Sequence, residues 1–463
     1  MTADNRRLVV LSLDGVPHGL LLRLMEQGRM PTLARLCEEH GRPRTMRSVL
    51  PTVSCVAWTC YATGRNPGKH GIFGFVDRRT GTYELGFPNA ANVRGPNLWE
   101  ILSGHGKKVF GMNVPGTYPP RPVNGILIGG FLAPSLSKVA YPAEVGGYLE
   151  GIGYRIDSDA ALARQSKEKM LEDLDVTLSR RAEAILHFLQ QDRWDFFHAH
   201  IMGTDRINHF LLRQVAEGHP RLAPAFYDYY GRVDAVAARL LEEIGSDRPL
   251  MIISDHGFCP IRYEVQLSRY LVEAGWTVPT ERVTGPLSID PARSKAFCLI
   301  PGRIYVNVRG REAAGCVAPQ EYQHVRQEIA DDLLALRDPQ GRPVIRAVLK
   351  REQVYWPSGS QGPDASAALA LGLPPFGMGP DLLAIPHDGY DLKMGLAAPE
   401  LFLNTQLEGM HTYSDAFFLG RGVEPPEGDL EIRQLAGAIL QKLSVPVPQE
   451  LDLAAVAPPV AAA

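Results

Sequence analysis

Apolar runs of strand length alternate with amphipathic stretches over the first two thirds of the chain. The apolar runs predict buried strands at residues 8–13, 108–113, 196–201 and 250–254. Helical periodicity predicts helices at residues 30–39, 167–190, 225–244 and 430–443. This alternation is typical of a mostly parallel sheet covered by helices, so the predicted fold class is α/β.

The amino-acid composition changes between about residues 259 and 404. Pro and Gly become frequent there, and a helical segment at 320–336 lies among turn-rich sequence. A strand at 415–420 and the helix after it then resemble a return to the core sheet. The sequence predicts a discontinuous core of residues 1–260 and 405–445, an inserted cap or substrate region at 261–404, and a C-terminal tail with little order at 446–463.

The composition of the chain argues against several classes of protein. The chain has 48 basic and 51 acidic residues, a net charge of −3, which argues against a globally basic nucleic-acid binder and predicts no stable nucleic-acid partner. The six cysteines contain no C-x-x-C pair, so we expect reduced thiols. A secretory leader and an apolar run of about 18 residues are both missing, which predicts a cytoplasmic protein without a membrane span.

Acidic residues follow three of the predicted strands. Asp14, Asp205 and Asp255 come at or shortly after their ends. Because the carboxyl ends of parallel strands share one edge, these carboxylates are expected to converge, and cations would then be needed to offset their repulsion.

Two of these carboxylates have histidines at useful spacing. Asp205 and His209 are four residues apart on a predicted helix, and His256 follows Asp255 directly. Carboxylate with imidazole suits zinc, manganese or iron. Each pair alone is weak evidence, because a D-x-x-x-H pattern on a helix is more often a surface ion pair.

A third feature is Ser54, which precedes a predicted helix at 55–63 that ends at Gly64. Its hydroxyl is expected at the N-cap position or just before it. Two interpretations stay open: a plain cap of the helix amides, or a nucleophile whose target phosphate is cradled by those amides.

The order of these motifs separates the interpretations. Asp14, Ser54, the pairs Asp205/His209 and Asp255/His256, and a late His411 occur together with Pro67-Gly-Lys-His70-Gly71. This order resembles the alkaline phosphatase superfamily, and most closely its type I phosphodiesterase/nucleotide pyrophosphatase branch, in a prokaryotic phosphohydrolase/phosphomutase-like subgroup. The resemblance implies a three-layer sandwich with a mostly parallel central sheet and an inserted cap region.

The resemblance also implies a site with two divalent metal ions, zinc first and manganese as the alternative. One ion would be held by Asp205, His209 and His411, and the other by Asp14, Asp255, His256 and the Ser54 oxygen. Ser54 would be the nucleophile that forms a phospho-seryl enzyme. The expected partner is a small phosphorylated substrate, either a phosphodiester or a nucleotide-like compound.

Further substrate contacts are weaker predictions. The resemblance implies an Asn three residues after the nucleophile that helps hold a phosphate oxygen, but this chain has Ala57 there, followed by Trp58. This leaves the Cys55 backbone amide and the metals to hold the phosphate charge. Lys69, Asn113 and Tyr118 are candidates for which solvation or loop structure is the competing explanation. Buried, hydrogen-bonded histidines are expected at His198 and His200, and His18 is given no metal role.

Three other functions are alternatives to this one. The residues after Ser54 and Cys55 lack the Pro and Arg that formylglycine sulfatases require, which excludes that chemistry. A phosphomonoesterase or phosphomutase of the same superfamily would use the same serine and metals. A non-catalytic metal-binding module is the alternative outside enzymes. The sequence is silent on oligomeric state.

Overall fold

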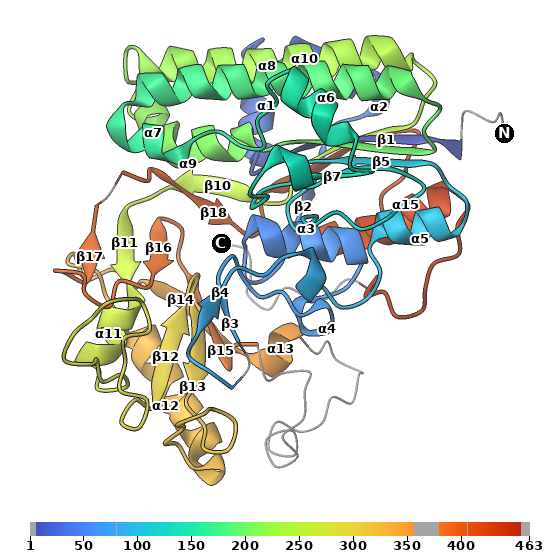
Figure 1. Ribbon diagram of the computed structural model, residues 1–463. Helices are drawn as coiled ribbons and strands as arrows, with labels where there is room; N and C mark the ends of the chain where they lie inside the picture. The colour runs from blue at the N-terminus through green and yellow to red at the C-terminus, as the bar shows by residue number, and fades with distance from the viewer. Residues whose placement is uncertain (1–5, 80, 356–378, 405, 455–463) are drawn as a thin grey trace. The chain divides into compact units, whose positions relative to one another are not determined.

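The apolar runs of the sequence become the strands of one large sheet. Its strands are β1 (Leu8–Leu13), β2 (Arg44–Met46), β5 (Val109–Met112), β6 (Gly125–Ile128), β7 (Ala140–Tyr141), β8 (Phe196–Ile201), β9 (Leu250–Ile253) and β19 (Ala416–Arg421). They lie in the order β2-β19-β9-β1-β8-β5-β6-β7 (Figure 1). The strands from β9 to β6 run parallel, and β2, β19 and β7 pair antiparallel at the edges.

Helices cover both faces of this sheet. One layer contains α1 (His18–Glu26), α2 (Pro31–His40), α8 (Lys167–Gln191), α9 (Gly203–Ala216) and α10 (Leu222–Ile244). The opposite layer contains α3 (Ser54–Thr63), α5 (Leu98–Gly104) and α15 (Leu435–Lys442) (Figure 1). The predicted α/β fold class, a three-layer sandwich around a mostly parallel sheet, is confirmed.

The two faces of the central strands differ in chemistry. In β1 every residue is buried, and Val9, Leu11 and Leu13 pack into the apolar core with the α8 and α10 layer. The intervening Ser12 is paired in register with His200 of β8, so polar groups lie on the α3 face. This register brings the ends of β1 and β8 level, and the Asp14 amide donates to the Ile201 carbonyl at 3.0 Å.

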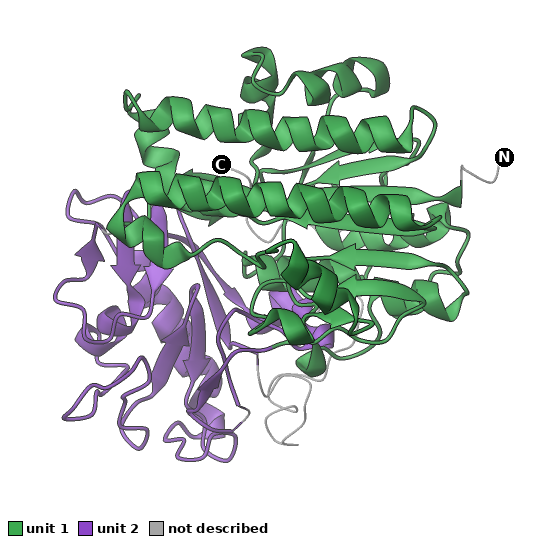
Figure 2. Cartoon of the chain, turned by 45° about the horizontal axis from the view of Figure 1, so that its top comes forward, with its two compact units in different colours: residues 1–65, 89–260, 406–455 green, residues 66–88, 261–405, 456–463 purple. Residues whose placement is uncertain are grey.

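The computed structural model describes residues 6–79, 81–355, 379–404 and 406–454. The chain divides into two units (Figure 2). Unit 1 comprises 1–65, 89–260 and 406–455, and it contains the large sheet; unit 2 comprises 66–88, 261–405 and 456–463. The predicted C-terminal tail falls partly at 455–463, which lies outside the described residues.

Unit 2 has its own sheets and its own apolar core. A four-stranded sheet consists of β12 (Ala296–Leu299), β13 (Arg303–Val306), β15 (Leu382–Pro386) and β14 (Ile345–Lys350), and helix α12 (Tyr322–Ala335) shares its core. A three-stranded sheet consists of β16 (Tyr390–Lys393), β11 (Tyr263–Gln266) and β17 (Phe402–Leu403), with α11 (Leu267–Glu273) following β11.

Residues 66–88 belong to unit 2, whereas the sequence analysis placed them in the core. They contain α4 (Pro67–His70) and the hairpin of β3 (Asp77–Arg78) and β4 (Leu85–Gly86). Two ion pairs with buried side chains hold this segment: Arg78 pairs with Glu312 at 2.6 Å, and Arg303 pairs with Asp77. A buried charge needs its partner close by, so these pairs fix the segment to unit 2.

Two expectations from composition concern the described residues. All six cysteines lie among them, and no disulfide joins any two. None of the described helices is long and apolar enough to cross a bilayer.

Candidate active site

The carboxyl ends of β1, β8 and β9 bring three acidic side chains together. Asp14 follows β1, Asp205 lies in the first turn of α9 after β8, and Asp255 is the second residue after the end of β9. Asp14 and Asp255 are fully buried and Asp205 is 2% exposed. The Gly15 amide donates to Asp255 Oδ1 at 3.0 Å, which ties the loops after β1 and β9 to each other.

Crowding of these carboxyls shifts their pKa values. Burial and the neighbouring Asp205 charge raise the pKa of Asp14 to about 8. Burial and the Asp14 charge also raise the pKa of Asp255. Burial opposes ionisation of Asp205 as well, but His209, His411 and Arg206 beside it lower its pKa below the usual value. Ionising all three together therefore calls for additional positive charge.

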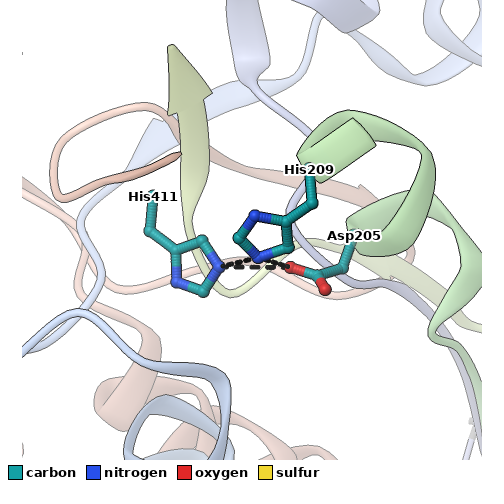
Figure 3. A group of neighbouring side chains, drawn as sticks. All are labelled: Asp205, His209 and His411. Atoms are coloured by element: carbon teal, nitrogen blue, oxygen red, sulfur yellow. Dashed lines mark hydrogen bonds and ion pairs between the residues drawn. The ribbon is translucent and has the colours of Figure 1, made fainter. Parts of the chain in front are cut away.

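The first cluster of side chains consists of Asp205, His209 and His411 (Figure 3). The i, i+4 spacing on α9 sets Asp205 and His209 one turn apart. His411 comes from β18 (Gly409–Thr412), which pairs antiparallel with β10 (Gly257–Pro260). His411 Nε2 lies 3.0 Å from His209 Nε2, and Asp205 Oδ1 lies 3.2 Å and 3.5 Å from these two nitrogens.

In each of the two imidazoles, the contact made by Nδ1 determines whether Nε2 carries a proton or a lone pair. His209 Nδ1 lies 2.9 Å from the Gly409 carbonyl, and His411 Nδ1 lies 3.2 Å from the Thr52 carbonyl. A carbonyl only accepts, so each Nδ1 carries the proton and each Nε2 presents a lone pair. Burial lowers the pKa of His209 to about 4, so this ring is neutral at pH 7. Two facing lone pairs beside a carboxylate oxygen fit one divalent cation.

The second cluster surrounds the Ser54 hydroxyl. Ser54 Oγ lies 3.1 Å from Asp14 Oδ1 and 3.1 Å from His256 Nε2. His256 Nε2 is 3.3 Å from Asp255 Oδ2, which has no hydrogen-bond partner among the described residues. His256 Nδ1 lies 3.1 Å from the Gly257 carbonyl, the same arrangement as in the first cluster. This donor set also fits a divalent cation.

The two clusters adjoin each other. Ligand atoms of Asp14, Asp205 and His256 all lie within 4.8 Å of one another. The His256 and His411 rings stack with their centroids 3.7 Å apart. The structure thus brings together all seven side chains for which the sequence analysis predicts metal ligation, although they range from Asp14 to His411.

Helix α3 places Ser54 differently from the sequence expectation. The N-cap is Val53, and Ser54 is the first residue of the helix. No side chain caps this helix end. The Ser54 hydroxyl instead donates to Asp14 Oδ1. Capping therefore does not explain this serine, and its hydroxyl points at the two clusters.

Three residues near the clusters were not singled out from the sequence for a role there. Trp58 Nε1 donates to Asp14 Oδ2 at 2.8 Å, and His200 Nε2 lies 3.2 Å from the same oxygen. Arg206 donates to Asp205 Oδ2 at 3.0 Å. The signals were present in the sequence, because Trp58 is one helical turn after Ser54 and the H-x-H pattern places His200 on the face of β8 that bears His198.

The weaker substrate predictions have different outcomes in the structure. Cys55 lies in the first turn of α3, where helix amides point outward. Asn113, after β5, is fully buried with a φ of 64°, and neither amide atom of its side chain has a hydrogen-bond partner among the described residues. Tyr118 is half-buried in the loop that follows, and Lys69 is exposed on α4 of unit 2. Contact of these groups with substrate stays a prediction. His18 lies against the Pro43 carbonyl at 3.1 Å.

Solved structures with a similar fold include several phosphorus-processing enzymes. Phosphonoacetate hydrolase from Sinorhizobium meliloti 1021, in complex with phosphonoacetate, has a TM-score of 0.62 and 18% sequence identity, with 95% of each chain covered. Human ectonucleotide pyrophosphatase/phosphodiesterase 5 has a TM-score of 0.56 and 13% identity, with 96% of each chain covered. Alkaline phosphatase PafA has a TM-score of 0.57 and 13% identity, over 97% of this chain and 98% of its own.

The sequence comparisons are more specific. A comparison with curated proteins finds no match. The family model described as type I phosphodiesterase/nucleotide pyrophosphatase matches residues 8–414, a range that contains every residue of both clusters. This match confirms the resemblance deduced from the motifs. The chain belongs to the type I phosphodiesterase/nucleotide pyrophosphatase family.

Proposed function

We propose that this chain is a two-metal phosphodiesterase that acts through a phospho-seryl intermediate on Ser54. The observation that carries the proposal is the position of Ser54 Oγ, 3.1 Å from both Asp14 Oδ1 and His256 Nε2, beside the second cluster of lone-pair donors. A hydroxyl held only for structure would not need fully buried acidic and imidazole partners that converge with further ligand atoms.

The proposed ligands form two sets. Asp205, His209 and His411 would hold one divalent cation; Asp14, Asp255, His256 and Ser54 would hold the other. Bound there, zinc or manganese would lower the pKa of the Ser54 hydroxyl and neutralise the charge that develops on the phosphate.

The chain's own groups supply the rest of the chemistry. Ser54 Oγ loses its proton to water and bonds to phosphorus as the bond to the leaving oxygen breaks. The leaving oxygen keeps the electron pair of that bond and takes up a proton from water, so it departs as the alcohol. The first turn of α3, which includes the Cys55 amide, faces the phosphate with the positive end of the helix. Water then breaks the Oγ–P bond, returns a proton to Ser54 and releases the phosphoryl product.

Two lines of support favour a diester substrate. The family model is named for phosphodiesterases and nucleotide pyrophosphatases. A murine pyrophosphatase/phosphodiesterase 5 with a similar fold is solved in complex with AMP, at a TM-score of 0.55. Monoester hydrolysis and phosphoryl return by a phosphomutase are the alternative results of the test, because they would use the same serine and ligands.

The test is a hydrolysis panel on the purified full chain with zinc or manganese restored. It compares a bis-aryl phosphate, an aryl monophosphate and a nucleotide diester. Ser54→Ala should reduce turnover by about a thousandfold or more, because it removes the attacking atom. Ser179→Ala is the matched control, since Ser179 is exposed on α8 and its hydroxyl donates to the Asp175 carbonyl of its own helix.

The outcomes separate the candidates. Serine-dependent diester cleavage, with phosphate recovered on Ser54 after rapid acid quench, supports the proposal. Turnover of the monoester alone would reassign the chain to phosphatase or mutase chemistry, and repeated release of free phosphate would exclude the mutase. Hydrolysis that persists unchanged in Ser54→Ala would contradict the nucleophile assignment.

A further inference from the structure

A chain of buried polar side chains runs beneath Asp14 on the α3 face of the sheet. The Tyr61 hydroxyl is 3.4 Å from His198 Nδ1, and Ser12 Oγ is 2.8 Å from His198 Nε2. Ser12 Oγ is also 2.8 Å from His200 Nδ1. His200 Nε2 lies 3.2 Å from Asp14 Oδ2, a contact whose geometry falls outside that of a hydrogen bond, and Nε2 has no hydrogen-bond partner among the described residues. All five side chains have no exposed surface. None of the first four takes part in the proposed reaction.

Ser12 Oγ has a third, longer contact with the Ala199 carbonyl at 3.5 Å, and one arrangement of protons satisfies the three shorter side-chain contacts that link Tyr61, His198, Ser12 and His200. Each neutral imidazole has one N–H donor and one lone pair. Tyr61 then donates to His198 Nδ1, His198 Nε2 donates to Ser12 Oγ, and Ser12 donates to His200 Nδ1. This leaves the His200 proton on Nε2, the ring nitrogen that lies 3.2 Å from Asp14 Oδ2. The opposite direction would place a lone pair toward Asp14 Oδ2 and would suit only a protonated carboxyl, whose proton Asp14 must give up when it binds a cation.

A second donor converges on the same oxygen. Trp58 Nε1, which can only donate, lies 2.8 Å from Asp14 Oδ2. The other oxygen, Oδ1, is the one that accepts from Ser54. The two oxygens of Asp14 therefore have different surroundings. Oδ2 faces Trp58 and His200, and Oδ1 faces Ser54 and the second cluster.

We propose that His200 is a positioning residue for Asp14: with Trp58 it holds Oδ2, so that Oδ1 is kept toward Ser54 and the cation of the second cluster. The inference rests on the proposed metal sites. Outer partners of this kind typically contribute about 10- to 100-fold to metal affinity.

Two substitutions at position 200 distinguish a hydrogen bond donated to Asp14 from a role of the His200 side chain in packing. In His200→Asn the amide can replace the Nδ1 contact with Ser12, but no donor reaches Asp14. In His200→Gln the longer side chain can place its amide N–H where Nε2 lies. We expect the first variant to weaken zinc binding at the second cluster by about 10- to 100-fold and the second to retain most of it. Ser12→Ala removes the hydroxyl that links His198 to His200 and leaves both histidines in the sequence, so it should give a smaller loss of zinc affinity at the same site.

The measurement is a zinc titration of the full chain in competition with a fluorescent chelator. His209→Ala provides a background in which only the second cluster binds, and Asp255→Asn a background in which only the first does. His187→Asn is the matched control, because His187 is a half-buried histidine on α8 that stacks on Tyr148. Circular dichroism and unfolding of each zinc-free variant report on the fold.

The expected result is a loss in the His209→Ala background and no change in the Asp255→Asn background. An unchanged zinc dissociation constant in His200→Asn would overturn the inference, and so would an equal loss in both backgrounds or an equal loss in His200→Gln. A wild-type chain that binds two zinc ions but cleaves no ester would contradict the proposed function and not this inference. A wild-type chain that binds no zinc would overturn both.

Discussion

Asp14 carries the clearest pH dependence at the scale of single residues. Burial and Asp205 raise the pKa of Asp14 from 3.8 to about 8, so the metal-free folded chain keeps a proton there that the unfolded chain loses at a lower pH. Stability from this group is present below about pH 4 and is lost as the pH rises toward 8. In urea unfolding with a chelator, the wild type should lose up to about 1.4 kcal/mol per pH unit relative to Asp14→Asn. Parallel profiles for the two chains would contradict this.

His209 and His411 contribute the two facing nitrogens of the first cluster, so neither should be dispensable. Removing one leaves a carboxylate and a single imidazole, too few protein ligands for a tight zinc site. His209→Ala and His411→Ala should each lower zinc content from two ions per chain to one, as measured by elemental analysis after dialysis. His40→Ala, at the exposed end of α2, should keep both. Full occupancy in both cluster variants would rule out the ligand assignment.

Spacing along the chain was enough to propose the metal ligands, whereas the residues that contact them depend on how the strands are paired. The Asp205/His209 pair follows from helix periodicity, and Asp255 with His256 from a strand end. The role of His200 depends on its pairing opposite Ser12 across β1 and β8, which a single sequence does not display. Trp58 likewise reads as an apolar helix residue until Asp14 is placed within 2.8 Å of its indole nitrogen.

Strand β18, which pairs with β10, carries His411 into the first cluster. Gly409, the first residue of β18, determines how closely the strand can approach α9. A Cβ on Gly409 would lie 2.4 Å from the Asn208 carbonyl, which is backbone and cannot rotate away. The Gly409 carbonyl also accepts from His209. Gly409→Ala should therefore displace β18, cost about 1–3 kcal/mol of unfolding free energy and empty the first cluster.

The control for this element is Gly147→Ala on α6 (Val145–Gly151), where a Cβ would meet nothing within 4 Å. Denaturant unfolding and zinc content measure the two effects. A Gly409→Ala chain with unchanged zinc content would show that β18 does not need this close approach.

Elements buried on both faces were predicted well, and elements shaped by local polar contacts were not. β1 and β8 have the predicted bounds, because a strand inside a covered parallel sheet is a continuous apolar run. The helix expected at 430–443 is instead a 3₁₀ turn at Ile432–Gln434 followed by α15. There the Glu431 amide donates to the Gln434 side chain and Arg433 pairs with Glu431, contacts that favour a tighter first turn.

At the scale of the whole molecule, unit 1 is assembled from segments that the sequence separates widely. The residues of the two clusters range from Asp14 to His411, and residues 261–405 of unit 2 lie in the sequence between Asp255/His256 and His411. The change of composition near residue 259 coincides with the boundary of unit 2 at residue 261. Nothing in the sequence indicated that residues 66–88 belong to unit 2, because the ion-pair partners of Arg78 and Asp77 lie more than 200 residues later in the chain.

Each unit has its own apolar core, so metal binding should stabilise them unequally. A ligand that binds only the folded state adds stability, about 2.7 kcal/mol for each site at a concentration 100 times its dissociation constant. Both proposed cations would join the ends of β1, β8 and β9 to α9 and β18, all within unit 1. Hydrogen exchange of the full chain, with zinc and with chelator, should therefore show slower exchange in β1, β8 and β9 on zinc binding. Amides of β12 to β15 in unit 2 should exchange at the same rate in both states. Equal slowing in the two units would mean that the cations stabilise the molecule as one cooperative body, and His411→Ala would then lower the protection of both.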